Sequence, residues 1–415
     1  MRVLLTSVGS SGDIHPFIAV GLALAGAGHD VAFAANPYFE SRITGAGLRF
    51  HPLGDALNPE DVARSNPAAF RRFTGARVLF REVFGPLMAR SIADLRTAAR
   101  AEGPAVMVGH QISFGGPWVA REVGAPWITC VLAPATLMSD HDPNVYPMGM
   151  DVRRAPMWFR RLQHGTGRRM VNGMLDPLLH DLRAEAGLTR RGDTFFGEML
   201  EGRVLGLFSP SYRGPAPDDP PGMTICGFPW FDRGAVGAGL DEELESFLGA
   251  GPPPVVIAMG SVLSQTEDVV LRRVVRACIA TGSRVVLVGR DGEAGAGDPR
   301  VVRVGYAPFG ALFPRSAAVV HHGGIGTTAQ ALRAGVPSVV LAFAHDQFDN
   351  AARVHRLGVG FKGTSGMSER AIADRVRAAC EDPAVRERAR VVGLQIASED
   401  GAGRAAEAVI CAVRA

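Results

Sequence analysis

The stretch AAVVHHGGIGTTAQALRAGVPSVVLAFAHDQFDNAARV, residues 317–354, decides the fold. Its first apolar run ends at His321 and His322, and the chain then turns through the glycines of GGIG. A helical pattern opens at Thr327, and a second apolar run follows at 338–343. Two buried strands joined by a helix are typical of a parallel sheet. The stretch therefore predicts one βαβ unit of a doubly wound α/β domain.

The same alternation of strands and helices extends through most of the chain. It predicts two Rossmann-like domains, residues 1–211 and 224–396, joined by the Pro/Asp/Gly-rich linker 212–223. The last stretch, 397–415, reads as one more amphipathic helix. The runs that predict buried strands are 2–8, 30–35, 105–110, 127–133 and 203–209 in the first half, and 253–261, 284–290, 301–306, 317–323 and 338–343 in the second.

Composition limits the classes of function. The chain has 415 residues, 47% hydrophobic and 20% charged, which is typical of a globular protein. Its net charge of +3 is too weak to indicate a nucleic-acid partner. The five cysteines are scattered without CxxC spacing, the N-terminus reads as a first strand, and no apolar run is long enough to span a membrane. We therefore expect a reduced, cytoplasmic protein, a monomer or a homodimer.

Two segments, 55–90 and 138–200, fit the strand–helix rhythm badly. The second contains RRAPMWFRRLQHGTGRRM, residues 153–170, in which arginines flank Trp158 and Leu162. This pattern is typical of a basic amphipathic helix that touches a membrane or a lipid-like ligand. A solvated surface helix with one packed apolar side explains it equally well, so the pattern leaves a peripheral membrane contact open.

The glycine-rich turn at 323–326 suits an anionic ligand. Glycines let a backbone approach a ligand closely, and a helix N-terminus offers free N–H groups and a positive partial charge. His322 and Thr327 can add side-chain donors, so the turn predicts a diphosphate site. An ordinary turn that needs its glycines only for geometry is the alternative.

Four motifs together resemble a known family. HHGGIGTT, followed by AGVP and then DQFDNA, is similar to the donor-binding motif of family 1 glycosyltransferases. GSSGDIHP stands where that family has its acceptor-side loop, AMGSVLS where it has a Gly-Ser turn, and YAPFGALFP where an aromatic residue stacks on the base. The resemblance implies the GT-B fold, α/β with two Rossmann-like doubly wound domains facing across a cleft. It also implies that the last helix packs back on the first domain.

The resemblance assigns donor-binding roles to matching positions. It implies that His322 contacts the α-phosphate, that Asp346 and Gln347 bond hydroxyls of the sugar, and that Tyr306 stacks on the pyrimidine. Gln330 stands where many UDP-sugar enzymes carry Glu for the ribose, which leaves UDP and dTDP donors both open. The remaining phosphate contacts implied are Ser261, Thr327 and the backbone at Gly324 and Gly326.

The matching turn of the first half is SSGDIHPFIAV, residues 10–20, which contains Asp13. Asp is a preferred residue at helix starts, so Asp13 is explained as a helix cap. The resemblance instead implies a general base. His110 ends the strand pattern 105–110, so either Asp13 takes the proton directly or His110 does and Asp13 orients it. His15 is a weaker candidate for the base. If Asp13 takes the proton directly, the reaction is an inverting displacement at the anomeric carbon.

The acceptor half matches the family poorly. Apolar and aromatic residues in the irregular segments suggest a hydrophobic acceptor, such as a natural-product aglycone, a sterol or a lipid. The candidate acceptor-binding residues are His15, Phe84, Phe114 and Met138. A non-catalytic nucleotide-sugar-binding homologue and a UDP-sugar 2-epimerase are the alternative functions.

No cofactor is expected beyond the nucleotide diphosphate sugar as co-substrate. The sequence shows no cluster of carboxylates suited to magnesium. The nearest set that could ligate a metal is His321, His322, His345 and Asp346. Adjacent histidines at a strand end point to opposite sides, so we expect no metal there.

Overall fold

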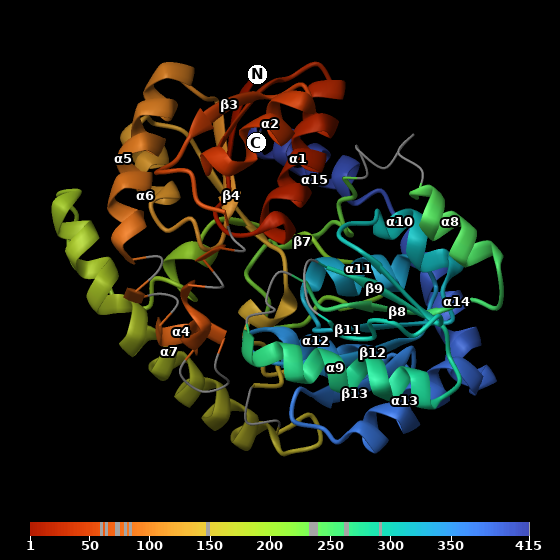
Figure 1. Ribbon diagram of the computed structural model, residues 1–415. Coiled ribbons are helices and arrows are strands. Elements are labelled where there is room, and N and C mark those ends of the chain that lie inside the picture. Colours follow the sequence, from red (N-terminus) through yellow and green to blue (C-terminus); the bar gives the residue numbers. More distant parts are fainter. Residues whose placement is uncertain are drawn as a thin grey trace.

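The structure is a computed structural model that describes residues 1–58, 61–62, 65–70, 75–78, 81–82, 85–146, 150–231, 240–260, 265–289 and 293–414. Two α/β domains make up the molecule, one coloured red to yellow-green and the other green to blue (Figure 1). Each is built on a parallel sheet whose strands are short and whose inner strands are largely apolar and buried. Such strands are buried on both faces and need helices on both sides.

The first sheet has the strand order β3-β2-β1-β4-β5-β6-β7, with every neighbouring pair parallel. Its order reverses between β1 and β4, which places the ends of these two strands at the topological switch point. Ligands in open α/β sheets bind at that point, outside the carboxyl ends of the strands. The strands are β1 (Arg2–Thr6), β2 (Asp30–Ala35), β3 (Arg49–Pro52), β4 (Val106–His110), β5 (Trp127–Val131), β6 (Arg203–Gly206) and β7 (Thr224–Ile225).

The second sheet has the order β10-β9-β8-β11-β12-β13, also wholly parallel. Its switch point lies between β8 and β11, so the turns that follow these two strands meet at one edge. The strands are β8 (Val255–Ala258), β9 (Val285–Val288), β10 (Val301–Val304), β11 (Ala318–His321), β12 (Ser338–Ala342) and β13 (Gly360–Thr364).

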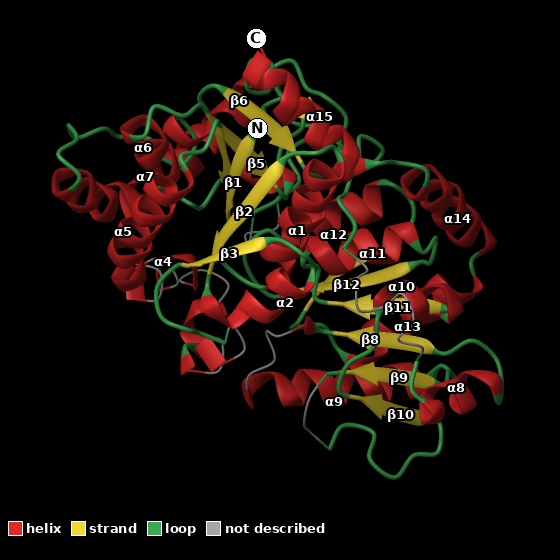
Figure 2. Cartoon of the chain, turned by 90° about the horizontal axis from the view of Figure 1, so that it is seen from above, coloured by secondary structure: helices red, strands yellow, loops and turns green. Residues whose placement is uncertain are grey.

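Helices cover both faces of the two sheets (Figure 2), which confirms the predicted fold class. In the first half they are α1 (Ser11–Gly26), α2 (Glu40–Gly45), α4 (Gly75–Val78), α5 (Gly85–Glu102), α6 (Gly116–Glu122) and α7 (Met157–Glu185). In the second half they are α8 (Glu242–Gly249), α9 (Gln265–Ala280), α10 (Phe309–Leu312), α11 (Ile325–Arg333), α12 (Gln347–Arg356), α13 (Glu369–Glu381), α14 (Pro383–Ala397) and α15 (Gly401–Arg414).

The chain passes between the domains more than once. Strand β7 lies beyond the segment 212–223, yet it pairs with β6 and belongs to the first sheet. The last helix, α15, lies beside α1 (Figure 1), and its Ala405 and Val409 join the same apolar core as Phe17 and Ile18. The first domain is therefore completed by the end of the chain.

A further apolar core is shared by both domains. It contains Leu137, Val145 and Tyr212 from the first half and Phe348 and Ile396 from the second, all buried. Side chains that pack in one core resist relative displacement, because close-packed interiors have few voids. The two halves of the candidate site are held together by this core.

Helix α7 spans 29 residues and includes most of the arginine-rich stretch. Trp158, Leu162 and Met170 on it are exposed. Among the described residues, no helix combines the length and the apolar character that crossing a membrane requires.

Candidate active site

The turn after β11 is fixed by its own side chains and glycines. His321 is buried, and its Nδ1 accepts a hydrogen bond from the backbone N–H of Gly323 at 3.1 Å. Gly323 has φ +93°, and a Cβ there would lie 2.7 Å from Val340 Cγ1. Only glycine avoids both the backbone strain and this clash. The two histidines therefore differ in role, and His321 holds the turn.

His322 lies in a slot between two glycines. A Cβ on Gly260 would come 2.6 Å from His322 Cε1, and a Cβ on Gly324 would clash with His322 Nε2. Burial lowers the pKa of His322 to about 4. Its imidazole is therefore neutral at pH 7 and can offer an N–H group to a phosphate oxygen, but not a positive charge.

Helix α11 begins directly after Gly324, so its free backbone N–H groups open on the candidate site. Thr328 caps the turn internally by donating to the Gly324 carbonyl at 2.9 Å, which leaves the half-buried Thr327 as the threonine available to a ligand. On the next turn, the buried Oε1 of Gln330 has no hydrogen-bond partner among the described residues. The predicted phosphate contact Thr327 and the predicted ribose contact Gln330 therefore lie on one helix.

The two domains meet at the N-termini of α1 and α11. A Cβ on Gly326 would lie 3.8 Å from the Cα of Gly12. The negative charge of Asp13 also acts on Asp346. The stretch 10–20 of the first domain therefore faces both the glycine-rich turn and the DQ pair, as the sequence predicted for a two-domain site.

Asp13 uses one carboxylate oxygen to hold its helix. Its Oδ2 accepts hydrogen bonds from the Ser10 backbone N–H at 2.7 Å and from Ser10 Oγ at 3.0 Å. This is the reciprocal half of a capping box. The other oxygen, Oδ1, lies 4.0 Å from His110 Nδ1, beyond hydrogen-bond distance. Because the side chain is 27% exposed, one oxygen remains free for a substrate.

His110 lies behind Asp13 at the end of β4. It is only 8% exposed, and its Nδ1 has no hydrogen-bond partner among the described residues. Burial lowers its pKa, while the charge of Asp13 and a hydrogen bond with the Val8 backbone act in the opposite direction. His110 is therefore adjacent to Asp13 but less accessible to an acceptor.

The DQ pair follows β12 on a tight loop. His345 has φ +54°, and Gln347 Oε1 accepts from the backbone N–H groups of Phe343 and Ala344 at 2.8 and 3.0 Å. The side-chain carbonyl oxygen of Gln347 thereby closes the loop. Burial raises the pKa of Asp346 to about 7, although Asn350, which donates to its Oδ2 at 2.8 Å, acts in the opposite direction.

Two donor-side predictions concern separate loops. Tyr306 follows β10 and is 76% exposed, so its ring is not packed against the protein. An exposed aromatic face is available for stacking on a base. Ser261 lies outside the described residues, directly after Gly260.

The three candidate acceptor residues that the structure describes are not gathered at one place, because His15 lies apart from Phe114 and Met138. Phe114 is buried in the core of the first domain, 6.0 Å from the ring of Phe195. His15 Nε2 lies 2.9 Å from Arg42 Nη1, and burial lowers the pKa of His15 to about 4. Met138 has φ +52° and packs at the edge of the same core as Phe114. Phe84 lies outside the described residues.

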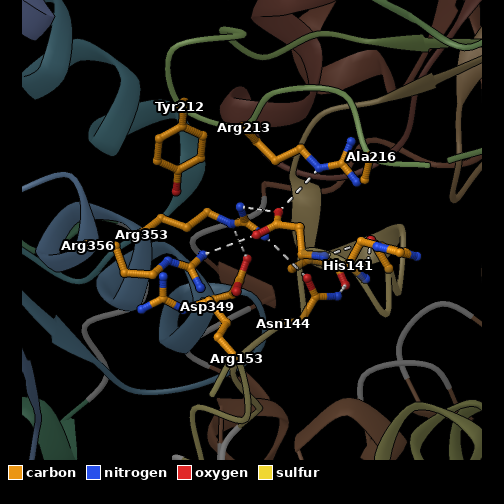
Figure 3. A network of polar contacts seen from close by, with 12 residues as sticks. His141, Asn144, Arg153, Tyr212, Arg213, Ala216, Asp349, Arg353 and Arg356 are labelled. Carbon is orange, nitrogen blue, oxygen red and sulfur yellow. Dashed lines mark hydrogen bonds and ion pairs between the residues drawn. The ribbon is translucent and has the colours of Figure 1, made fainter. Parts of the chain in front are cut away.

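A network that the sequence did not reveal joins the domains at α12 (Figure 3). Arg353 donates to Asp349 Oδ2 and to Asp142 Oδ2, both at 2.6 Å, and to Asn144 Oδ1 at 3.4 Å. Arg213 approaches the same oxygen of Asp142 at 3.3 Å from another direction. Asp142, Asn144 and Arg213 stand in irregular or Pro/Gly-rich sequence, where no motif or periodicity marks them. Asp349 and Arg353 lie on α12, but nothing in the local sequence shows that their partners come from the first domain.

No group of histidine, cysteine and acidic residues with the arrangement of a metal site occurs among the residues that the structure describes. The set formed by His321, His322, His345 and Asp346 is divided by the turn. His321 contacts Gly323 on one side, and His322 lies between Gly260 and Gly324 on the other.

Comparison with known families supports the assignment of both halves. Residues 3–121 match the glycosyltransferase family 28 N-terminal domain, and residues 280–410 match the erythromycin biosynthesis protein CIII-like C-terminal domain. The chain is 33% identical over 424 residues to O-mycaminosyltylonolide 6-deoxyallosyltransferase of Streptomyces fradiae, covering 97% of this chain and 95% of that protein. It is 30% identical over 375 residues to vancomycin aglycone glucosyltransferase of Amycolatopsis orientalis, covering 87% and 85%.

Solved structures agree with this over the whole length. Spinosyn forosaminyltransferase SpnP superposes with a TM-score of 0.72 at 22% identity, and each chain is fully covered. Glycosyltransferase VinC in complex with dTDP superposes with a TM-score of 0.69 at 21% identity, also over both full chains. These structures share the fold, and the relatives of higher identity share the reaction class. The chain therefore belongs to the family 1 glycosyltransferases of the GT-B fold.

Proposed function

We propose that this glycosyltransferase moves a sugar from a UDP- or dTDP-sugar to a hydroxyl of a hydrophobic small molecule, with inversion at the anomeric carbon. The meeting of α1 and α11 at Gly12 and Gly326 carries this proposal. At this contact, Asp13 of the first domain faces the glycine-rich turn, which we propose for the diphosphate, and the DQ pair, which we propose for the sugar. A donor bound at the turn would then present its anomeric carbon to Asp13.

The donor half of the proposal rests on neutral hydrogen-bond donors. The leaving nucleoside diphosphate gains negative charge as its bond to the sugar breaks, and preorganised N–H groups stabilise such charge. The backbone at Gly324 and Gly326, the hydroxyl of Thr327 and the neutral ring of His322 supply them. We propose that Gln330 bonds the ribose and that Asp346 and Gln347 bond the sugar, without a metal ion.

Asp13 is the proposed general base. The acceptor oxygen attacks the anomeric carbon, the bond from that carbon to the diphosphate oxygen breaks, and the acceptor proton passes to Asp13 Oδ1. Ser10 holds the other oxygen and so fixes the carboxylate. His110, behind it, is a positioning residue in this proposal, because it is the more buried of the two. An α-linked donor would give a β-linked product.

The relatives suggest the class of acceptor. Relatives of this chain are named for sugar transfer to O-mycaminosyltylonolide, to the vancomycin aglycone and to sterols. We propose that this chain also takes a hydrophobic hydroxylated acceptor, a natural-product aglycone before a sterol, because the more similar relatives act on such compounds.

Ligand binding followed by product analysis tests the proposal. We expect one nucleotide class in a panel of UDP- and dTDP-sugars to raise Tm, because a ligand that binds only the folded state stabilises it. That donor, incubated with hydroxylated aglycones, should then yield a product heavier by one sugar in mass spectra. Donor binding without any product, and Asp13→Asn binding like wild type, would favour a non-catalytic homologue instead.

We also propose a peripheral contact of α7 with anionic lipid. Trp158 and Leu162, one helical turn apart, are both exposed, and Arg161 between them is largely exposed as well. An exposed aromatic residue beside arginines suits the interface of an anionic membrane. The protein should sediment together with phosphatidylglycerol vesicles. The double variant Trp158→Ser with Leu162→Ser should remain in the supernatant. Equal sedimentation of the double variant would contradict this contact.

A further inference from the structure

Asn350 lies on α12 one turn after Asp346 and is completely buried. Its side chain makes three hydrogen bonds to three separate parts of the molecule. Nδ2 donates to Asp346 Oδ2 and to the Gly323 carbonyl, both at 2.8 Å, and Oδ1 accepts from Tyr212 Oη at 2.7 Å. One amide thus links the DQ pair, the glycine-rich turn and the segment after β6.

The three partners fix the orientation of this amide. The carboxylate of Asp346 and the carbonyl of Gly323 accept hydrogen bonds, so both must face the amide nitrogen. The amide oxygen is then left for the Tyr212 hydroxyl, which has to donate. A flipped amide would set its oxygen against two acceptors and lose both of those bonds. The hydroxyl of Tyr212 is therefore the group that completes the arrangement.

Tyr212 is itself held firmly in the core between the domains. Its ring lies 5.8 Å from that of Phe228, and the guanidinium of Arg353 lies 6.0 Å from the ring centre (Figure 3). Arg353 is bound in turn by Asp349 and by Asp142 of the first half. The position of the Tyr212 hydroxyl is therefore set by the contact between the two halves of the chain.

We propose that Asn350, oriented by the hydroxyl of Tyr212, is a positioning residue that aims the Asp346 carboxylate at the hydroxyls of the donor sugar. This rests on the proposed function, because it requires that Asp346 contact the sugar. A carboxylate oxygen that accepts from Asn350 cannot rotate freely, so its companion oxygen points in a fixed direction. The same amide fixes the distance between Asp346 and the turn that receives the diphosphate.

The charged neighbours of Asp346 give the inference a pH signature. Asp13 faces it from α1 and Asp349 lies on its own helix, and both disfavour its ionised form. The Asn350 hydrogen bond favours the ionised form, whereas Arg353 is directed to Asp349 and Asp142. Loss of the Asn350 bond should raise the pKa of Asp346. Affinity for the nucleotide sugar falls at low pH as Asp346 becomes protonated, and this low-pH limb should then move to higher pH.

The test uses Tyr212→Phe, which keeps the ring and removes only the hydroxyl. We expect about tenfold weaker binding of the nucleotide sugar, the size of one lost hydrogen bond in a buried network. The bare nucleoside diphosphate, which lacks the sugar, should lose much less affinity. Asn350→Ala should act in the same direction and more strongly. Tyr38→Phe, which removes the hydroxyl of an exposed tyrosine that bonds neither Asn350 nor Asp346, serves as the matched control.

A double-mutant cycle shows whether the effect passes through Asp346. In an Asp346→Asn background, Tyr212→Phe should cost little further sugar affinity, because the carboxylate that it positions is gone. Isothermal titration with UDP-glucose, dTDP-glucose, UDP and dTDP from pH 5.5 to 8.5 supplies both the affinities and the pH limb.

The outcomes separate this inference from the proposed function. If the wild type binds neither nucleotide sugar nor diphosphate, the proposed function fails and this inference with it. If the wild type binds and Tyr212→Phe weakens sugar and diphosphate equally, without a shifted pH limb, Tyr212 is only structural and the inference alone is overturned. Additive losses in the Asp346→Asn background would overturn it as well.

Discussion

Asp13 shows how one side chain can hold a helix and also suit the proposed role of general base. Its two oxygens differ, since Ser10 donates to Oδ2 while no residue in the described part of the chain lies within hydrogen-bond distance of Oδ1. The two interpretations that the sequence left open, a cap and a base, are therefore compatible. The cap in fact favours the base, because it prevents the carboxylate from rotating away from the donor site.

Replacing Asp13 by Asn separates the two roles. The amide oxygen can still accept from Ser10, so the free energy of unfolding should change by less than about 1 kcal/mol. Turnover should fall at least about 100-fold, because the amide cannot take a proton. Ser10→Ala should do the reverse, with a cost of about 1 kcal/mol in stability and most of the turnover retained. Comparable turnover of Asp13→Asn and wild type would refute the assignment of the base.

The slot around His322 predicts an effect of a single methyl group. Gly324→Ala would place a Cβ against His322 Nε2 and push the ring from the position in which we propose that it contacts the diphosphate. Displacement of a binding group by about 1 Å can cost about 100-fold in rate, so we expect a fall in kcat/KM of that order. Gly366→Ala is the matched control, because a Cβ there meets only Thr364 Oγ1 at 3.9 Å. Equal kcat/KM for the two variants would exclude the tight slot.

Sequence alone gave a more specific prediction for the donor residues than for the acceptor residues. His322, Thr327 and Asp346 belong to motifs whose spacing carries structural meaning, namely a strand end, a glycine turn and a helix start. Phe114 was inferred only from its apolar character, and that character also describes the core residue that it is. Asn350 was overlooked because its role depends on Tyr212, 138 residues away.

At the scale of elements, α12 carries more than its motif suggests. One end of it presents Asp346 and Gln347, and its next turns bind the first half of the chain through Asn350 and Arg353. The segment 212–223 was predicted as a linker from its prolines and glycines. The structure shows Tyr212 and Arg213 buried there, because a stretch poor in regular structure can still pack its side chains.

Removal of the Arg353 charge should destabilise the protein strongly. The side chain is 3% exposed and binds two carboxylates, so Arg353→Met would leave Asp349 buried without its cation. Loss of one partner from a buried ion pair costs about 3–5 kcal/mol, which urea unfolding can measure. Arg390→Ala, which breaks an exposed pair with Glu387, should cost less than about 1 kcal/mol. A similar small loss for Arg353→Met would mean that the network contributes little.

At the scale of the molecule, the apolar runs predicted the inner strands of both sheets, because parallel strands buried on two faces read as continuous apolar runs. They did not predict the edge strands β3 and β13, whose sequences RFHP and GFKGT contain polar residues and are only partly buried. They could not predict that β7 would join the first sheet, since a two-residue strand carries no such signal. The relative position of the domains depends on the shared core of Leu137, Val145, Phe348 and their neighbours. Those contacts join residues some 200 positions apart, and no local pattern encodes them.

Buried histidines predict how the whole molecule responds to acid. Burial lowers the pKa of His15, His322 and His345 to about 4 and of His321 to about 3, against an ordinary value of 6.5. As the pH falls below 6.5, these histidines therefore bind protons in the unfolded chain but not in the folded chain. The free energy of unfolding falls as a result, until about pH 4. Asp346, with its pKa raised to about 7, acts in the opposite sense, because the folded form holds that proton first.

Burial also lowers the pKa of His110, and it raises the pKa of Glu399. Five buried histidines outweigh the two carboxyl groups Asp346 and Glu399, so the net change below pH 6.5 is a loss of stability. Each histidine contributes at most about 1.4 kcal/mol per pH unit. Urea unfolding at pH 7.5, 6.5, 5.5 and 4.5 should show the decline beginning near pH 6.5. In His321→Asn the amide oxygen can still accept from the Gly323 N–H. This variant should reduce the slope of the free energy of unfolding against pH by the contribution of one histidine. A free energy of unfolding that stays level from pH 6.5 to 4.5 would show that these histidines bind protons in the folded protein. The assignment of His322 as a neutral hydrogen-bond donor in the proposed donor site would then be wrong.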